Sequence, residues 1–106
     1  MQLQITGRHT HITDEERAIF SEKLGKYQKK VAGLTKIDAV VNSEGGRQDA
    51  EVILHVAHSN PIVAKASADS HMAALDLIIG KLDNLVSRLN DKLHSHHKSK
   101  STNSIE

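Results

Sequence analysis

Hydrophobic and polar residues alternate along four short stretches of the chain, which is the pattern of strands that bury one face and expose the other. These stretches are residues 1–6, 36–44, 49–57 and 62–68. The pair Gly45-Gly46 separates the second stretch from the third and predicts a hairpin turn, and residues 58–61 predict another turn. Gly7 follows the first stretch, where we expect that strand to end.

The alternation also assigns a buried side to each predicted strand. The inward-facing residues are expected to be Met1, Leu3, Ile5, Ile37, Ala39, Val41, Ala50, Val52, Leu54, Val56, Ile62, Ala64, Ala66 and Ala68. The opposite side is mostly polar, with Val40, Ile53 and Val63 as apolar exceptions. One buried face and one wet face indicate a sheet that is covered on a single side.

Residues 14–31 instead repeat apolar side chains at the period of a helix. Four of these side chains fall within one narrow arc: Phe20, Leu24, Tyr27 and Val31. Thr13 and Glu16 have the spacing of a capping box, in which each side chain binds a free backbone N–H group at the helix start. We therefore predict one helix between the first two strands, which Gly33 stops.

A second helix is predicted over about residues 70–95, with Asp69 or Ser70 as its cap. Its apolar positions are Leu75, Ile78, Ile79, Leu82, Val86, Leu89 and Leu93. At 1.5 Å per residue the helix is roughly 38 Å long, whereas a sheet of four such strands is roughly 20 Å on a side. Its C-terminal turns should therefore extend beyond the sheet.

The predicted order of elements is β-α-β-β-β-α. The first two strands can pair in parallel through a right-handed crossover, and the other strands form an antiparallel meander. The fold class is therefore predicted as α+β, a two-layer sandwich in which both helices cover one face of a four-stranded mixed sheet. Residues 1–98 are expected to form a single domain, and residues 99–106 a polar, disordered tail.

Composition narrows the possible functions. Of the 106 residues, 38% are hydrophobic but only 2% are aromatic, so the core must be aliphatic. The absence of cysteine excludes disulfides and thiolate zinc sites. No apolar run approaches the roughly 20 residues of a membrane span and residues 1–7 do not resemble a signal peptide, so we expect a cytoplasmic protein. The net charge of only +1 means that nucleic-acid binding must depend on segregated charges.

Charges are indeed segregated on the predicted helices. The first helix carries a basic stripe of Lys23, Lys26 and Lys30. The second has a basic flank of Lys81, Arg88 and Lys92 and an acidic flank of Asp76, Asp83 and Asp91. Cations at successive positions suit a phosphate backbone, since each neutralised phosphate releases counterions, although solvated helix faces show the same pattern. Because both aromatic side chains point to the core, backbone and shape recognition of structured RNA is favoured over base stacking.

Eight histidines raise the question of a metal site. They include the cluster His94, His96 and His97 and the close pairs His9 with His11 and His55 with His58. The pattern H-E-x-x-H is missing, so we predict neither a metal site nor a cofactor, and expect solvated or RNA-facing histidines. His55 is expected to belong to a cross-strand pair. No nucleophile motif or phosphate-binding loop is present, so the chain is not expected to be an enzyme.

Four segments in order, "MQLQITG", "ITDE…EKLGK", "DAEVILHV" and "HMAALDLIIGKL", resemble the ribosome hibernation-promoting factor and ribosome-associated inhibitor family. The resemblance covers about residues 1–98. It implies a protein that binds the small ribosomal subunit in the mRNA and tRNA channel, chiefly through basic residues of both helices. Such proteins block translation in stress or stationary phase, and some promote ribosome dimers. The chain is expected to correspond to the short form of the family.

The resemblance carries over residue by residue. Lys23, Lys26 and Lys81 match basic positions of the family, and Arg88 stands where the family has lysine. Asn84 occupies a position that is arginine in the family, which shifts the expected contact to Arg88 and Lys92. Met72 replaces the usual tyrosine.

From the charge pattern and the resemblance together we predict contacts with 16S rRNA phosphates in the small subunit and the 70S ribosome. The predicted contact residues are Lys23, Lys26, Lys30, Lys81, Arg88 and Lys92. The protein itself is expected to be monomeric and to bind neither DNA nor membranes. The alternative is a protein-interaction domain that uses the exposed sheet face without binding RNA.

Overall fold

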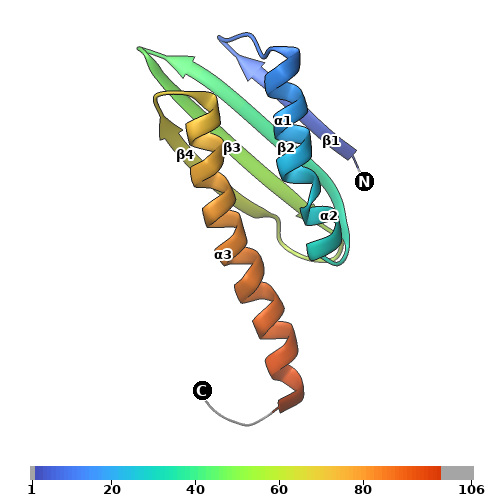
Figure 1. The fold of residues 1–106 in the computed structure, drawn as a ribbon. Helices are drawn as coiled ribbons and strands as arrows, with labels where there is room; N and C mark the ends of the chain where they lie inside the picture. Colours follow the sequence, from blue (N-terminus) through green and yellow to red (C-terminus); the bar gives the residue numbers. More distant parts are fainter. Residues whose placement is uncertain (1, 99–106) are drawn as a thin grey trace.

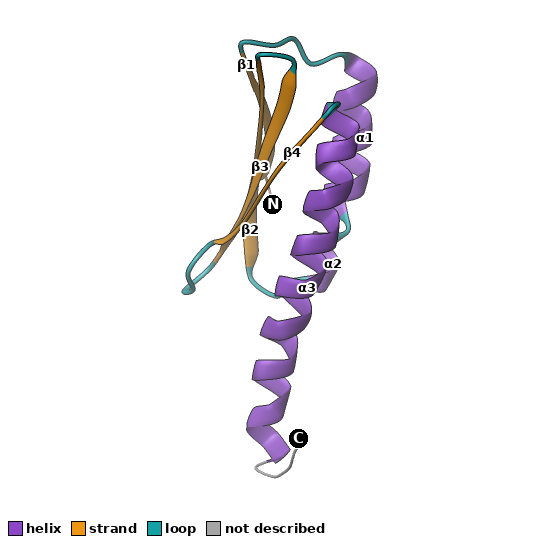
Figure 2. Cartoon of the chain, turned by 90° about the vertical axis from the view of Figure 1, so that its left-hand side faces the viewer, coloured by secondary structure: helices purple, strands orange, loops and turns teal. Residues whose placement is uncertain are grey.

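The structure, a computed structural model, describes residues 2–98, with side chains described as far as Leu89. The elements in order are β1 (Gln2–Arg8), α1 (Asp14–Gly25), α2 (Tyr27–Lys30), β2 (Leu34–Glu44), β3 (Arg47–Val56), β4 (Ile62–Ala68) and α3 (His71–Lys98). The strands form one layer, and the helices pack on a single face of it (Figures 1 and 2). The predicted α+β fold is confirmed.

The sheet has the strand order β1-β2-β3-β4. β1 pairs with β2 in parallel, and the other neighbours are antiparallel, as predicted. At the hairpin between β2 and β3, Gly45 and Gly46 have φ angles of 58° and 80°. Positive φ at both positions gives the turn a twist that matches its flanking strands, and glycine adopts it without steric cost.

The core lies between the sheet and the helices and is mainly aliphatic. Its buried residues are Ile5, Ile12, Phe20, Leu24, Tyr27, Val31, Ile37, Ala39, Val41, Ala50, Val52, Leu54, Ala64, Ala74, Leu75, Ile78, Leu82 and Val86. The predicted inward faces of β2 and β3 are therefore confirmed, as is the arc of the first helix. Burial of this apolar surface is what fixes the helices on the sheet.

The predicted single helix over residues 14–31 is wrong in its second half. The capping box is present, with the Glu16 N–H donating to the Thr13 hydroxyl oxygen at 3.1 Å. However, α1 ends at Gly25, a residue of low helix propensity, and α2 forms one further turn. Val31 is extended, and Gly33, with φ of 81°, lies in the turn before β2 rather than at a helix end.

Gly7 does not end the first strand, because β1 continues through Arg8. Its role is steric. A side-chain Cβ atom at this position would lie 2.8 Å from the carbonyl oxygen of Thr10, closer than such atoms normally approach. Glycine therefore allows the chain to fold back tightly between β1 and α1.

α3 begins after Ser70, whose hydroxyl oxygen accepts a hydrogen bond from the Ala73 N–H at 3.1 Å. Ser70, and not Asp69, is therefore the cap. The helix continues through Lys98 and its C-terminal half extends well past the sheet (Figure 1), which gives the molecule principal extents of 50 × 26 × 20 Å. The predicted overhang is confirmed. Across residues 2–98, no helix has the length and apolar character needed to cross a membrane.

Candidate nucleic-acid interface

Lys23 in the last turn of α1 and Lys26, between α1 and α2, face the acidic flank of α3. The Lys23 Nζ atom lies 3.0 Å from an oxygen of Asp76, and the Lys26 Nζ atom lies 3.2 Å from an oxygen of Asp83. These side chains are between 35% and 65% exposed. The first pair and Lys26 also line a shallow hollow between the helices. Both contacts are therefore surface ion pairs, which water and salt weaken.

Asp83 also accepts a hydrogen bond from a buried tyrosine of α2. The Tyr27 ring is fully buried, and its hydroxyl group lies 2.7 Å from an oxygen of Asp83 and 3.3 Å from the Ile79 carbonyl oxygen. Burial, followed by the hydrogen bond to Asp83 and its negative charge, raises the pKa of Tyr27 well above its usual value. Tyr27 therefore remains a hydrogen-bond donor throughout the physiological pH range.

Asp83 stays ionised because its hydrogen-bond donors and the nearby lysine charges stabilise the carboxylate. Burial disfavours its charge, but the hydrogen bonds from Tyr27 and Lys26 and the charges of Lys26 and Lys30 outweigh burial and lower the pKa of Asp83. The Lys26 amine also lies 5.1 Å from the centre of the Tyr27 ring, within the range of a cation–π contact. The Lys26–Tyr27–Asp83 cluster thus joins the end of α1 and α2 to α3.

The basic flank of α3 lies beside β4, an edge strand of the sheet. The Lys81 amine donates a hydrogen bond to the backbone carbonyl oxygen of Lys65 on β4. A carbonyl group carries no net charge, so it leaves the charge of Lys81 uncompensated. The carboxylates of Asp76 and Asp83, in contrast, neutralise the charges of Lys23 and Lys26. Lys81 and Arg88, together with Asn84 and Val63, line an open hollow between α3 and β4.

The predicted contact residues therefore lie in two rows that are separated by the acidic flank of α3. The first row is Lys23, Lys26 and Lys30, and the second contains Lys81 and Arg88. Among side chains up to Leu89, no carboxylate lies within 4.0 Å of the amine or guanidinium groups of Lys30, Lys81 or Arg88. Lys92 falls outside the residues whose side chains are described.

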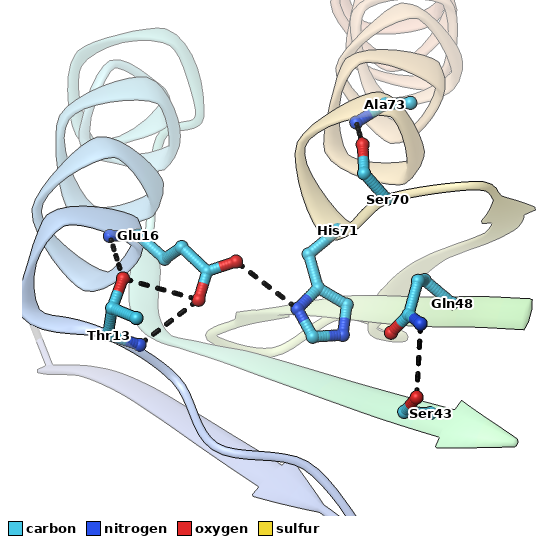
Figure 3. A network of polar contacts seen from close by, with 7 residues as sticks. All are labelled: Thr13, Glu16, Ser43, Gln48, Ser70, His71 and Ala73. Atoms are coloured by element: carbon cyan, nitrogen blue, oxygen red, sulfur yellow. Dashed lines mark hydrogen bonds and ion pairs between the residues drawn. The ribbon is translucent and has the colours of Figure 1, made fainter. Parts of the chain in front are cut away.

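A buried histidine joins the starts of α1 and α3 (Figure 3). His71 is only 7% exposed, and its Nδ1 atom lies 3.4 Å from a Glu16 oxygen. The Thr13 backbone N–H donates to the same carboxylate at 3.0 Å. This backbone bond lowers the pKa of Glu16, and the contact with His71 adds to the effect against the opposing influence of burial. Among the described side chains and backbone, the buried His71 Nε2 atom has no hydrogen-bond partner.

The outer face of the sheet is mainly polar and carries both signs of charge. The His55 Nε2 atom lies 2.9 Å from an oxygen of Asp38, which confirms that His55 belongs to a cross-strand pair. Lys65 and Glu51, which are directly opposite in the register of β3 and β4, lie 3.7 Å apart. Val63 is 41% exposed, whereas Val40 and Ile53 are half-buried among these polar groups.

The histidine pairs do not assemble into a metal centre in the part of the chain that the structure describes. There, no three histidine, aspartate or glutamate side chains converge as metal ligands. His9 instead lies 3.2 Å from the Asn42 side-chain oxygen. The cluster of His94, His96 and His97 falls outside the described side chains.

Comparison with known proteins identifies the family. Residues 3–94 match the sequence profile of the family described as Sigma 54 modulation protein / S30EA ribosomal protein. The chain belongs to this family. The ribosome hibernation promoting factor of Azotobacter vinelandii is 31% identical over 83 residues, which are 78% of this chain and 77% of the relative. That of Salmonella typhimurium is 31% identical over 96 residues, 91% of this chain and all of the relative.

The fold of the family agrees with the structure. A ribosomal subunit interface protein from Coxiella burnetii superposes with a TM-score of 0.74 and 20% sequence identity. The match covers 85% of this chain and 98% of that protein. The resemblance found in the sequence is thereby confirmed at the level of family and fold.

Proposed function

We propose that the protein is a ribosome hibernation factor that acts by binding and occlusion, without catalysis. It binds the small ribosomal subunit in the channel used by mRNA and tRNA and blocks translation under stress or in stationary phase. The observation that carries the proposal is the similarity to hibernation promoting factors over 96 residues, 91% of the chain. A chain that is similar along nearly its whole length has the same elements available for the same contacts.

The distribution of charge supports binding to rRNA phosphates. Lys30, Lys81 and Arg88 present cationic groups outside the described ion pairs, on both sides of the acidic flank of α3. These cations lie on α2 and α3, so we assign the helix side of the molecule to the RNA. The binding energy comes largely from counterion release, which makes the complex sensitive to salt.

The shape of the molecule supports occlusion of a channel. The domain is 50 Å along its longest axis and 20 to 26 Å across, and the extended end of α3 accounts for much of its length (Figure 2). A narrow, elongated body can enter a channel that accommodates an RNA strand and exclude that strand by its volume alone. Inhibition then requires no chemical step and no cofactor.

The proposal is tested by cosedimentation of the purified chain with small subunits and with 70S ribosomes over a series of salt concentrations. We expect stoichiometric binding at low salt that decreases steadily as salt rises. Absence of cosedimentation even at low salt contradicts the proposal. Prior occupation of the channel by mRNA and tRNA should reduce binding, because the ligands compete for one space.

A second candidate is a protein-interaction domain that uses the outer face of the sheet. The observation in its favour is the exposed, apolar side chain of Val63, which lies beside Ile53 in the register of β3 and β4. Neutralising Lys81 and Arg88 distinguishes the two functions. The change should weaken binding to the ribosome but leave a contact through the sheet face intact.

A further inference from the structure

The acidic flank of α3 is placed to compete with RNA for Lys23 and Lys26. Lys23 and Lys26 are among the predicted contact residues, yet each lies within 3.2 Å of an aspartate of α3. A phosphate group and a carboxylate compete for the same ammonium group, since both neutralise it at close range. Contact of either lysine with RNA therefore requires that its aspartate be displaced.

We propose that Asp76 and Asp83 are built-in competitors of RNA phosphate, so that Lys23 and Lys26 bind RNA only by exchanging an intramolecular ion pair for an intermolecular one. This inference rests on the proposed function. The interface then has two kinds of cation. Open cations, on the basic flank of α3 and on α2, have no described carboxylate within 4.0 Å and make the first contacts. Closed cations, Lys23 and Lys26, are paired with an aspartate and engage afterwards. The aspartates thereby limit the affinity and set its dependence on salt.

The structure makes such an exchange feasible. The Lys23 and Asp76 side chains are 43% and 65% exposed, so an approaching phosphate can reach the amine without any movement of the backbone. Exposed ion pairs of this kind are weak, because water and salt screen them and both long side chains lose freedom in forming them. A polyanion that offers several phosphates can outcompete one carboxylate.

Asp83 has a second hydrogen-bond donor besides Lys26. The Tyr27 hydroxyl group donates to the Asp83 oxygen at 2.7 Å, and this bond does not involve Lys26. When Lys26 turns toward a phosphate, Asp83 keeps one strong donor and the positive charge of Lys30 nearby. The carboxylate is therefore not left without a partner, which lowers the cost of releasing the lysine.

Exchange also predicts a change in the salt dependence of binding. In the wild-type chain a lysine that moves to a phosphate frees an aspartate, which then attracts a cation from solution. This uptake offsets part of the counterion release. Removing the carboxylate removes the offset, so the plot of log K against log salt should become steeper. The change should be up to about one unit for Asp76 and smaller for Asp83, which keeps the Tyr27 donor and the charge of Lys30 nearby.

The test compares three single variants of the full chain: Asp76→Asn, Asp83→Asn and the control Asp38→Asn. Asp38 lies on the outer face of the sheet, 3.5 Å from Lys36, so its substitution also releases a lysine and adds one positive charge. Affinity for isolated small subunits is measured at several salt concentrations. We expect the two α3 variants to bind about two- to five-fold tighter than wild type, with steeper salt dependence, and the control to change less.

The two failures are distinguishable. Equal gains for all three variants overturn the exchange and leave only an effect of net charge, while the proposed function stands. No binding by the wild-type chain at any salt overturns the proposed function and the exchange together. If Asp83→Asn impairs folding, Asp76→Asn decides, because the described contacts of Asp76 include no buried group.

A double-mutant cycle gives an independent measure of the exchange. Lys26→Gln in the wild-type background should reduce affinity less than two-fold, because the lysine gains a phosphate only by losing Asp83. In the Asp83→Asn background the same substitution should remove the whole affinity gain of that variant. Equal effects of Lys26→Gln in both backgrounds contradict the exchange.

Discussion

The hydroxyl group of Tyr27 donates a 2.7 Å hydrogen bond to Asp83, across the junction between α2 and α3. Tyr27 is fully buried, whereas Asp83 keeps part of its carboxylate in solvent, so the bond connects the core to the charged surface. It fixes the position of Asp83 relative to Lys26. The most buried aromatic group of the protein therefore helps to organise a surface that we assign to RNA.

Tyr27→Phe should lower the free energy of unfolding by about 1 kcal/mol at pH 7, since it removes the donor to Asp83 but keeps the buried ring. The pKa of Tyr27 is raised in the folded state, so its contribution is complete below the unfolded pKa of about 10 and is lost as the pH rises above it. Denaturant unfolding from pH 7 to 11 should show that wild-type stability falls more steeply than that of Tyr27→Phe. Parallel pH profiles contradict this role.

Glu16→Gln should change the acid side of the stability profile. The pKa of Glu16 is lowered in the folded state, so its ionised form stabilises the fold above the unfolded pKa of about 4.3, and this contribution is lost as the pH falls through the folded pKa. The variant keeps an oxygen that can accept from the Thr13 N–H but has no charge to lose. Its stability should therefore decrease less than that of wild type between pH 5 and pH 3 in thermal unfolding, and an unchanged acid profile argues against this assignment.

Leu82→Ala and Leu77→Ala form a matched pair on α3. Leu82 is fully buried between the helix and the sheet, while Leu77 is 52% exposed. The first substitution should lower the free energy of unfolding by about 2–5 kcal/mol through lost burial and a residual cavity, and the second by less than about 1 kcal/mol. Chemical denaturation measures both, and similar losses would show that α3 does not pack as described.

Neutralising the basic flank of α3 should weaken binding to the small subunit and flatten its salt dependence. The variant Lys81→Gln/Arg88→Gln removes two open cations, so the slope of log K against log salt should decrease by about two units. The control Lys36→Gln/Arg47→Gln removes the same charge from β2 and β3. If both variants bind alike, the effect comes from overall charge and not from this flank.

Much of the fold could be predicted from the sequence, because the burial of one face of a strand or helix imposes a regular spacing of apolar residues. The alternation in β2, β3 and β4 predicted which side chains are buried, and β4 has the predicted bounds, Ile62–Ala68. The break at Gly25 was missed, since the apolar arc continues through Tyr27 and Val31 although the helix does not. Periodicity indicates which side chains are buried more reliably than it indicates an unbroken helix.

The candidate interface was predictable only in part. The sequence showed two basic rows and one acidic row, but the partner of each row depends on how α1 and α3 turn toward each other. The pairing of Lys23 with Asp76 is a tertiary contact between residues 53 positions apart, without a local signal. His71 was missed for a related reason, because its contact with Glu16 joins residues 55 positions apart.

We propose that the helix side of the protein faces 16S rRNA in the small subunit, and directed hydroxyl-radical cleavage can test this orientation. The chain contains no cysteine, so a single introduced cysteine carries the iron chelate without interference. Asn84→Cys places the probe on α3 between Lys81 and Arg88, and Gln4→Cys places it on the exposed face of β1. We predict strong cleavage of 16S rRNA lining the mRNA and tRNA channel from position 84 and weak cleavage from position 4. Strong cleavage from position 4 alone, or none from either position in a complex that cosediments, would contradict this orientation.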